Sequence, residues 1–219
     1  SAQGVELDAQ TVVLRAVPKW LNDTLAERHL DPAHPHVFAT CPMNAVQLTP
    51  HLERELRSDH AGETGAVSIY QGIATVARWR KDAELMAFAA QHGQTEAEHL
   101  MLIEAWLPAS RRSRLLGPWR LAGWLTGALP ALLGRRAVYG TIAAVETFVD
   151  HHYQQQIEHI QQFGGPDGLL PLLLRCQADE QHHRDEAAAL AGHRPAWLRA
   201  WCAVVGMGSA GAVVLARRV

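Results

Sequence analysis

From residue 51 onward, apolar and polar side chains follow the period of amphipathic helices. No segment of useful length shows the strict alternation of a half-buried strand. Glycine and proline clusters, such as Gly-Gly-Pro-Asp-Gly at 164–168, mark the helix ends. We therefore predict four long helices, which suit a four-helix bundle, over about 51–79, 82–107, 136–163 and 169–191.

Two apolar segments lie outside these helices. Residues 108–136 place tryptophan and leucine within a frame of arginines, and their uncharged stretch 121–134 is too short to span a bilayer. This composition is typical of a helix in the lipid headgroup region. The second segment, 197–216, is near the lower limit for spanning, and its glycines favour close helix packing. We expect membrane contact through both segments, while packing on the bundle or on a sister subunit stays open.

Charge and cysteine content narrow the classes of function. A formal net charge of −2 gives no support to a nucleic-acid partner. The three cysteines are far apart and form no CxxC pair, which argues against a disulfide scaffold or a rubredoxin-type iron site. Residues 1–50 carry one plausible helix, around 9–30, and then a proline-rich loop. We expect an N-terminal extension of unknown function there, followed by one domain at 51–219.

Two Glu-x-x-His motifs lie in the second and fourth predicted helices, as Glu96-x-x-His99 and Glu180-x-x-His183. Residues three apart share one face of a helix, so a carboxylate oxygen and an imidazole nitrogen can reach one metal ion from adjacent turns. A single motif of this kind is weak support, because helices rich in Glu and His produce it by accident.

A further glutamate precedes each motif, on the preceding helix. Glu63 precedes Glu96 by 33 residues, and Glu146 precedes Glu180 by 34. A tyrosine follows each upstream glutamate by seven residues, so the chain repeats one helical hairpin twice. Two such hairpins packed together form the di-metal carboxylate site of ferritin-like proteins. The six predicted metal ligands are Glu63, Glu96, His99, Glu146, Glu180 and His183.

The surroundings of the upstream glutamates support burial, since Glu63 and Glu146 both lie in apolar stretches. Four buried carboxylates would repel one another unless cations compensate them. We therefore predict an all-α, ferritin-like four-helix bundle with additional apolar interfacial helices. A bundle in which the six side chains are exposed or ion-paired, with no metal, is the alternative.

The donor set indicates which metal is bound. Four oxygen donors and two imidazoles without a thiolate favour iron or manganese over structural zinc. We expect two iron ions, with manganese left open, and coordination positions that admit O2 as a co-substrate.

Several neighbours of the predicted ligands are candidates for supporting roles. Asp59 lies one turn before the first glutamate and is expected to hold a ligating histidine. His152 and Tyr153 are the candidate catalytic residues, which could orient a substrate, relay a proton or pass an electron. Only one of His151 and His152 can face inward, and a core aromatic role for Tyr153 stays open.

The residues around the second motif have simpler expectations. His182 flanks a ligand and is expected to be exposed or to support the site from outside. A solvated or ion-paired face is expected for Asp179, Arg184 and Asp185.

The motifs together resemble the demethoxyubiquinone hydroxylase family of ubiquinone biosynthesis, over about residues 51–219. The resemblance implies a peripheral membrane di-iron monooxygenase that uses O2 and two electrons to hydroxylate the ring of a polyprenylated quinone or quinol, at the cytoplasmic face of the inner membrane in a bacterium. It places His152 and Tyr153 near the metal centre and implies contact with a membrane surface. Partner proteins of ubiquinone biosynthesis and a homo-oligomer are left open. The resemblance rests on Asp59-His60-Ala61-Gly62-Glu63-Thr64-Gly65-Ala66, Glu96-x-x-His99, Val145-Glu146, His151-His152-Tyr153 and Asp179-Glu180-x-x-His183.

Other functions use similar ligands. A ferroxidase would need a soluble shell, and a rubrerythrin-type peroxidase would want a cysteine-bound iron. A lipid-binding helical module and a hydroxylase acting on another quinone or on a tRNA base are further alternatives.

Overall fold

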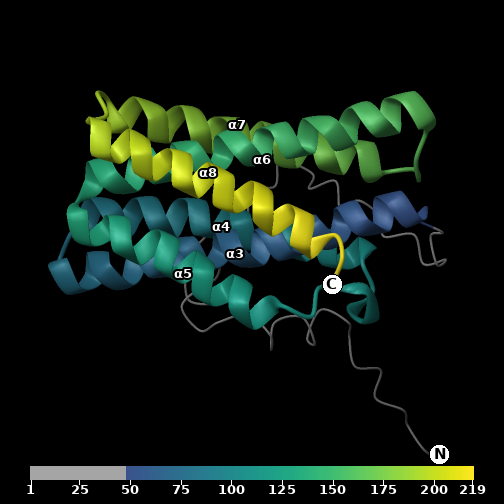
Figure 1. The fold of residues 1–219 in the computed structure, drawn as a ribbon, viewed down its shortest axis with the longest axis horizontal. Helices are drawn as coiled ribbons and strands as arrows, with labels where there is room; N and C mark the ends of the chain where they lie inside the picture. The colour runs from purple at the N-terminus through teal and green to yellow at the C-terminus, as the bar shows by residue number, and fades with distance from the viewer. Residues whose placement is uncertain (1–47) are drawn as a thin grey trace, which may run out of the picture. The chain divides into compact units, whose positions relative to one another are not determined.

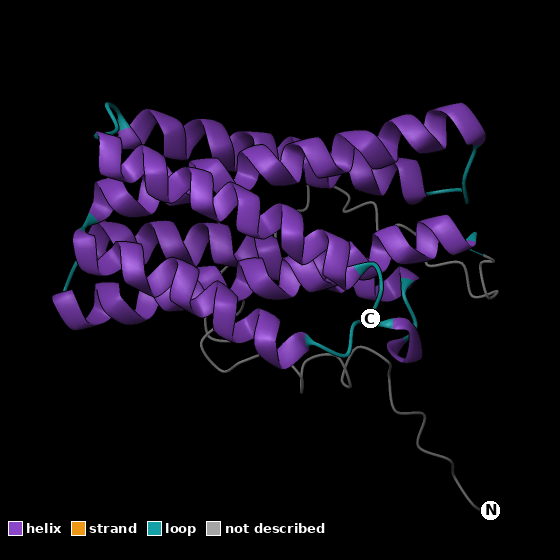
Figure 2. Cartoon of the chain, in the orientation of Figure 1, coloured by secondary structure: helices purple, strands orange, loops and turns teal. Residues whose placement is uncertain are grey.

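A computed structural model describes residues 48–219, and the described residues form helices and loops without a strand (Figures 1 and 2). The all-α prediction is confirmed, and the four predicted bundle helices are α3, α4, α6 and α7. The helix expected around 9–30 lies outside the described residues. The elements are α3 Pro50–Arg80, α4 Ala83–Trp106, the 3-10 turn η1 Ala109–Arg111, α5 Leu116–Leu133, α6 Arg135–Phe163, α7 Leu169–Ala191 and α8 Ala196–Ala216.

Local capping explains where the first hairpin turns. Thr49 caps α3, and its Oγ1 accepts a hydrogen bond from the Leu52 amide at 3.2 Å. Helix α3 ends at Lys81, whose φ of 57° is left-handed and breaks the helical ladder. The next residue, Asp82, already caps α4 by accepting from the Leu85 amide at 3.1 Å. A two-residue connection therefore sets α4 directly against α3.

The core of the bundle consists of two apolar clusters with a polar layer between them. One cluster packs side chains such as Ile73, Leu85 and Ile142, and the other packs side chains such as Leu56 and Leu173. Along all four bundle helices, the predicted metal ligands fall between the residues of one cluster and those of the other. The fold thus closes the polar layer at both ends with apolar side chains.

Helix α5 packs along α3 through glycines. A Cβ on Gly127 would lie 1.9 Å from the carbonyl oxygen of Ile69, and one on Gly123 would lie 2.3 Å from that of Gly65. The two backbones therefore approach so closely that only glycine fits at these positions. The segment 108–136 is thus a loop, η1 and a helix docked on the bundle by one face.

Helix α8 lies across α6 (Figure 1). Near its start, Trp201 Nε1 donates to Thr141 Oγ1 at 2.8 Å, and near its end Arg217 donates to Glu55 Oε2 at 2.7 Å. The expected close packing through the α8 glycines is not found among residues 48–219, because a Cβ on Gly206 would meet no atom within 4 Å.

The outer faces of α5 and α8 expose large apolar side chains, among them Leu129, Leu133, Trp197 and Met207. By length and composition, α8 could cross a bilayer, a property that alone does not show a span. Membrane contact stays a prediction, but both helices leave an apolar surface for it.

Because α5 approaches α3 closely, the effect of a glycine-to-alanine substitution on stability should depend strongly on its position. Gly127→Ala should lower the free energy of unfolding by about 1–3 kcal/mol, since its methyl group overlaps the Ile69 carbonyl. Gly206→Ala, in open space, should raise it by about 0.5–1 kcal/mol through helix propensity. Chemical denaturation of both variants measures the difference. Equal effects would show that α5 does not pack as described.

Candidate metal centre

The six predicted ligands converge in the polar layer between the two apolar clusters. They come from four helices, and each side chain is at most 4% exposed. Their oxygen and nitrogen atoms form two groups, in each of which the donor atoms lie within 4.8 Å of one another. The first donor group is Glu63, Glu96, His99 and Glu180, and the second is Glu96, Glu146, Glu180 and His183.

Two glutamates connect the groups, because Glu96 and Glu180 belong to both. Each histidine lies beside the glutamate of the other motif. His99 Nδ1 is 3.0 Å from Glu180 Oε1, and His183 Nδ1 is 3.1 Å from Glu96 Oε1. The arrangement offers two adjacent metal positions with two shared carboxylates, and the buried groups could hold metal ions.

Most carboxyl groups of the polar layer are difficult to ionise without a nearby cation, as their pKa values show. Burial, and next the Glu96 charge, raise the pKa of Glu63 well above its usual value, and burial with the Glu180 charge does the same to the pKa of Glu146. Burial opposes ionisation of Glu180 as well, but the imidazoles of His183, 3.7 Å away, and of His99, hydrogen-bonded to Oε1, lower its pKa to about 2.

No arginine or lysine of residues 48–219 forms an ion pair with any of the four carboxylates. Three buried carboxylate oxygens there have no hydrogen-bond partner among the described residues: Glu63 Oε2, Glu96 Oε1 and Glu180 Oε2. A buried oxygen without a partner is costly, and a metal ion would satisfy each of them. The donor set therefore fits a pair of divalent cations.

Two buried tyrosines repeat the internal duplication. The Tyr153 hydroxyl donates to Glu63 Oε1 at 2.6 Å, and the Tyr70 hydroxyl donates to Glu146 Oε1 at 3.3 Å. Each tyrosine thus holds the upstream glutamate of the other hairpin. The hydrogen bond of Tyr70 was not anticipated, although its seven-residue spacing from Glu63 was the available signal.

One expectation about a supporting residue is met and another is wrong. Asp179, expected on a solvated or ion-paired face, is 39% exposed and ion-paired: it accepts a hydrogen bond from His99 Nε2 at 3.0 Å and so orients this predicted ligand. Asp59, expected to hold a ligating histidine, lies 2.9 Å from Nε2 of His152 instead. The ion-paired face expected for Arg184 is present, since it contacts Asp150 and Asp185.

His152 belongs to a buried polar network beside the metal centre. Asp59 Oδ1 also accepts from Gln156 Nε2 at 2.8 Å. Burial raises the pKa of Asp59, and the hydrogen bond with His152 opposes this shift. His152 is buried while its neighbour His151 is exposed, as expected of two adjacent helix positions.

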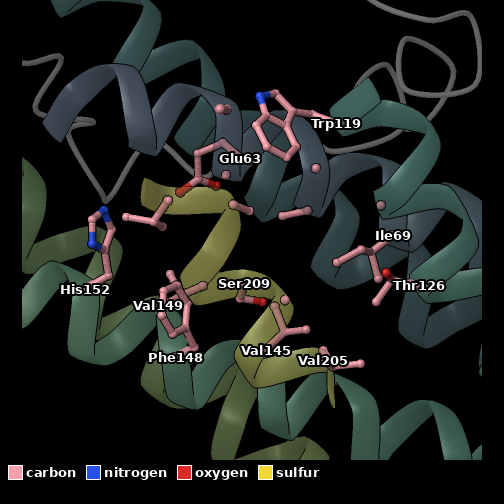
Figure 3. Close-up of a pocket in the computed structure, with 18 of the residues that line it drawn as sticks. Glu63, Ile69, Trp119, Thr126, Val145, Phe148, Val149, His152, Val205 and Ser209 are labelled. Carbon is pink, nitrogen blue, oxygen red and sulfur yellow. The ribbon is translucent and has the colours of Figure 1, made fainter. Parts of the chain in front are cut away.

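A pocket of about 400 Å³ reaches the metal centre from one side (Figure 3). Helices α3, α5, α6 and α8 supply nearly all of its wall, and α4 and α7 supply only Glu96 and Glu180. Figure 3 shows Glu63 and His152 at one end of the pocket, with Ile69 and Thr126 at the other. The wall is mostly apolar, so the pocket suits a largely apolar molecule with one end at the carboxylates.

A family model described as "Ubiquinone biosynthesis protein COQ7" matches residues 50–216. The chain belongs to the COQ7 family. The resemblance seen in the motifs and the ferritin-like fold are thereby confirmed. The matched range runs from the first residue of α3 to the last residue of α8, so the COQ7 unit includes both outer helices.

Curated relatives carry hydroxylase names. The "3-demethoxyubiquinol 3-hydroxylase" of Rhodospirillum rubrum is 39% identical over 140 residues, which are 61% of this chain and 62% of the relative. The "NADPH-dependent 3-demethoxyubiquinone 3-hydroxylase, mitochondrial" of Dictyostelium discoideum is 33% identical over 135 residues, 60% of this chain and 61% of the relative. The "3-demethoxyubiquinol 3-hydroxylase" of Legionella pneumophila is 33% identical over 145 residues, which are 65% of this chain and 66% of the relative. The matches thus span less than two thirds of each relative.

The raised carboxylate pKa values predict an unusual pH dependence for the metal-free protein. Folding retains protons on Glu63, Glu96 and Glu146, so their contribution to stability is complete below the usual pKa of 4.5 and is lost as pH rises. The pKa of His183, raised from 6.5 to about 9, acts in the same direction. The melting temperature of the metal-free protein should therefore fall between pH 6.5 and about 9, and added Fe²⁺ should remove the fall.

Glu63→Gln tests by mutation how much the buried carboxyl groups destabilise the metal-free protein. Folding of the metal-free protein forces Glu63 to take up a proton above its usual pKa, so an uncharged glutamine there should raise the melting temperature at neutral pH and weaken metal binding. Glu158→Gln is the matched control, because Glu158 is exposed on α6 and, among residues 48–219, its carboxylate accepts a hydrogen bond from the Gln154 side chain alone. A metal-free Glu63→Gln protein less stable than wild type would contradict the electrostatic account.

Proposed function

We propose that this COQ7-family chain is an O2-dependent di-iron monooxygenase that hydroxylates the ring of a demethoxyubiquinol-type precursor. The observation that carries the proposal is an apolar pocket ending at a buried pair of carboxylate–histidine donor groups. The names of the curated relatives supply the substrate class. The balanced reaction takes one oxygen atom of O2 into the ring and reduces the other to water with two electrons and two protons.

Each donor group would hold one iron ion, with Glu96 and Glu180 shared between the two. Iron bound there supplies the activation of O2 and the transfer of electrons. The protein keeps the donors in place through Tyr70, Tyr153 and Asp179, which bond three of the six ligands from outside. The two apolar clusters exclude water from the reacting ring.

His152 is proposed to handle a proton of the substrate. It lines the pocket, and its Nε2 faces Asp59 Oδ1 at 2.9 Å. We assign the ring proton to Nε2, since a carboxylate accepts it there, which leaves the lone pair on Nδ1. A hydroxyl of the quinol ring would hydrogen-bond to that atom and lose its proton to it.

The outer helices are proposed to connect the pocket with lipid. Inner-face residues of α5 and α8, such as Thr126 and Val205, line the pocket, and their outer faces expose residues such as Leu129 and Met207. A polyprenyl tail that leaves the pocket between these helices would pass into an apolar surrounding. We propose peripheral membrane association, at the cytoplasmic face of the inner membrane in a bacterium. Partner proteins and a homo-oligomer stay open.

The pocket also bears on the alternatives. A ferroxidase takes iron itself as its substrate, and a mostly apolar pocket beside the centre has no part in that reaction. Hydroxylation of another quinone is the second candidate, because an apolar wall accepts related rings equally well.

Expression in cells that lack the ring hydroxylase of ubiquinone biosynthesis tests the proposal. Wild-type chain should restore ubiquinone and deplete the demethoxy precursor, as measured by mass spectrometry of extracted quinones. Glu146→Gln should leave the precursor in place, since it removes a donor of the second group. Persistence of the precursor with folded, iron-loaded wild-type chain would refute the substrate assignment.

The adjacent histidines give a sharper test of the proposed proton transfer. His152→Asn should lower kcat by about 10²-fold with unchanged iron content, because it removes the proposed base. His151→Asn is the matched control, exposed on the same turn, and should keep the wild-type kcat. Assays of the purified variants on a soluble short-tail quinol decide the matter. Equal kcat values for both variants would exclude the assigned role.

A further inference from the structure

A second set of polar side chains lies beside the metal centre, on the side of α4 and α7. His92 of α4 is 1% exposed and belongs to neither donor group. Its Nε2 lies 3.1 Å from Oε2 of Glu186 on α7, whose side chain is 35% exposed. This pair therefore reaches from the buried centre towards solvent, on a side where the pocket has almost no wall.

The two side chains approach each other without a hydrogen bond. His92 Nδ1 and Nε2, and Glu186 Oε2, have no hydrogen-bond partner among the described residues. Leaving three buried polar atoms unpaired is costly unless something else binds them. An ion between the nitrogen and the oxygen would satisfy one atom of each side chain.

The separation of the pair is the one expected of two ligands on a single ion. Two donors at about 2.0–2.2 Å from a common metal ion lie about 3 Å apart when they are neighbours in octahedral geometry. The 3.1 Å between His92 Nε2 and Glu186 Oε2 equals the separation of His183 Nδ1 and Glu96 Oε1 in the metal centre. The geometry is thus that of a partial metal site.

The pair also connects an exposed histidine with the centre through successive contacts. His182, 69% exposed, places its Nε2 3.8 Å from the same Glu186 oxygen. On the inner side, the His92 ring meets the ring of the predicted ligand His183 edge to face, with 4.3 Å between centroids. From outside to inside the order is His182, Glu186, His92 and His183.

We propose that His182, Glu186 and His92 form a transient divalent-metal site through which iron is loaded into the centre. Two or three protein donors completed by water bind more weakly than the four donors of each group in the centre, so an ion passes inward. The apolar pocket on the other side is a poor route for a hydrated dication. The inference rests on the metal centre of the proposed function and not on its quinone chemistry.

Iron uptake by the metal-free protein tests the loading site. The protein is mixed anaerobically with Fe²⁺, unbound iron is trapped with a chelator at set times, and iron per chain is counted. Glu186→Gln and His92→Phe should slow uptake about tenfold by removing an attracting charge or a donor. Phenylalanine keeps a ring against His183, and both variants should reach the wild-type final content. Glu158→Gln is the control, with the same charge change on an exposed face of α6, and should load at the wild-type rate.

A second measurement distinguishes loss of the loading site from a general defect in folding. Titration of iron-loaded protein with Co²⁺ should show one weak additional site in wild type and in Glu158→Gln, and none in Glu186→Gln. The inference would be overturned if Glu186→Gln and His92→Phe both took up iron at the wild-type rate. A reduced final iron content in both variants would overturn it as well. Wild-type protein that binds no iron would refute the metal centre itself, whereas failure of the quinone assay alone leaves these uptake results unchanged.

Discussion

Burial of four carboxylates at the middle of a helical bundle is the constraint on which the structure depends. Apolar clusters enclose the layer from both ends, and no lysine or arginine of residues 48–219 pairs with these carboxylates. Two histidines and two tyrosine hydroxyls offset part of this charge, and the cations that the donor groups could hold would offset the rest. The helices could bury more apolar area if the layer were apolar, so the layer lowers the stability of the metal-free fold in return for chemistry.

The donor set could be predicted from the sequence because it is encoded within single helices. A glutamate and a histidine three apart share a face wherever the helix lies, and the repeated spacing of Glu63 to Glu96 and Glu146 to Glu180 identifies the second hairpin. The supporting residues were harder, since their partners lie on other helices. Asp179 reaches His99 across the α4–α7 interface, and the rotation that brings them together is set by packing, which spacing along the chain does not encode.

The outer helices show again that contacts between helices could not be predicted from the spacing of residues along the chain. Composition predicted apolar segments at 108–136 and 197–216, and both contain helices on the outside of the bundle. Which glycines mediate close packing could not be predicted: Gly123 and Gly127 of α5 meet the backbone of α3, whereas Gly206 of α8 meets nothing within 4 Å. The pocket likewise arises only once α5 and α8 dock on α3 and α6, so no local pattern announces it. One side of the centre is thereby apolar, and the α4–α7 side carries the polar residues that reach solvent.

Anomalous X-ray diffraction from crystals loaded anaerobically with iron tests the central claim most directly. The account predicts two strong iron peaks in the layer between the apolar clusters, one within each donor group, with Glu96 and Glu180 touching both. A single peak, peaks outside this layer, or side chains that turn away from the ions would contradict it.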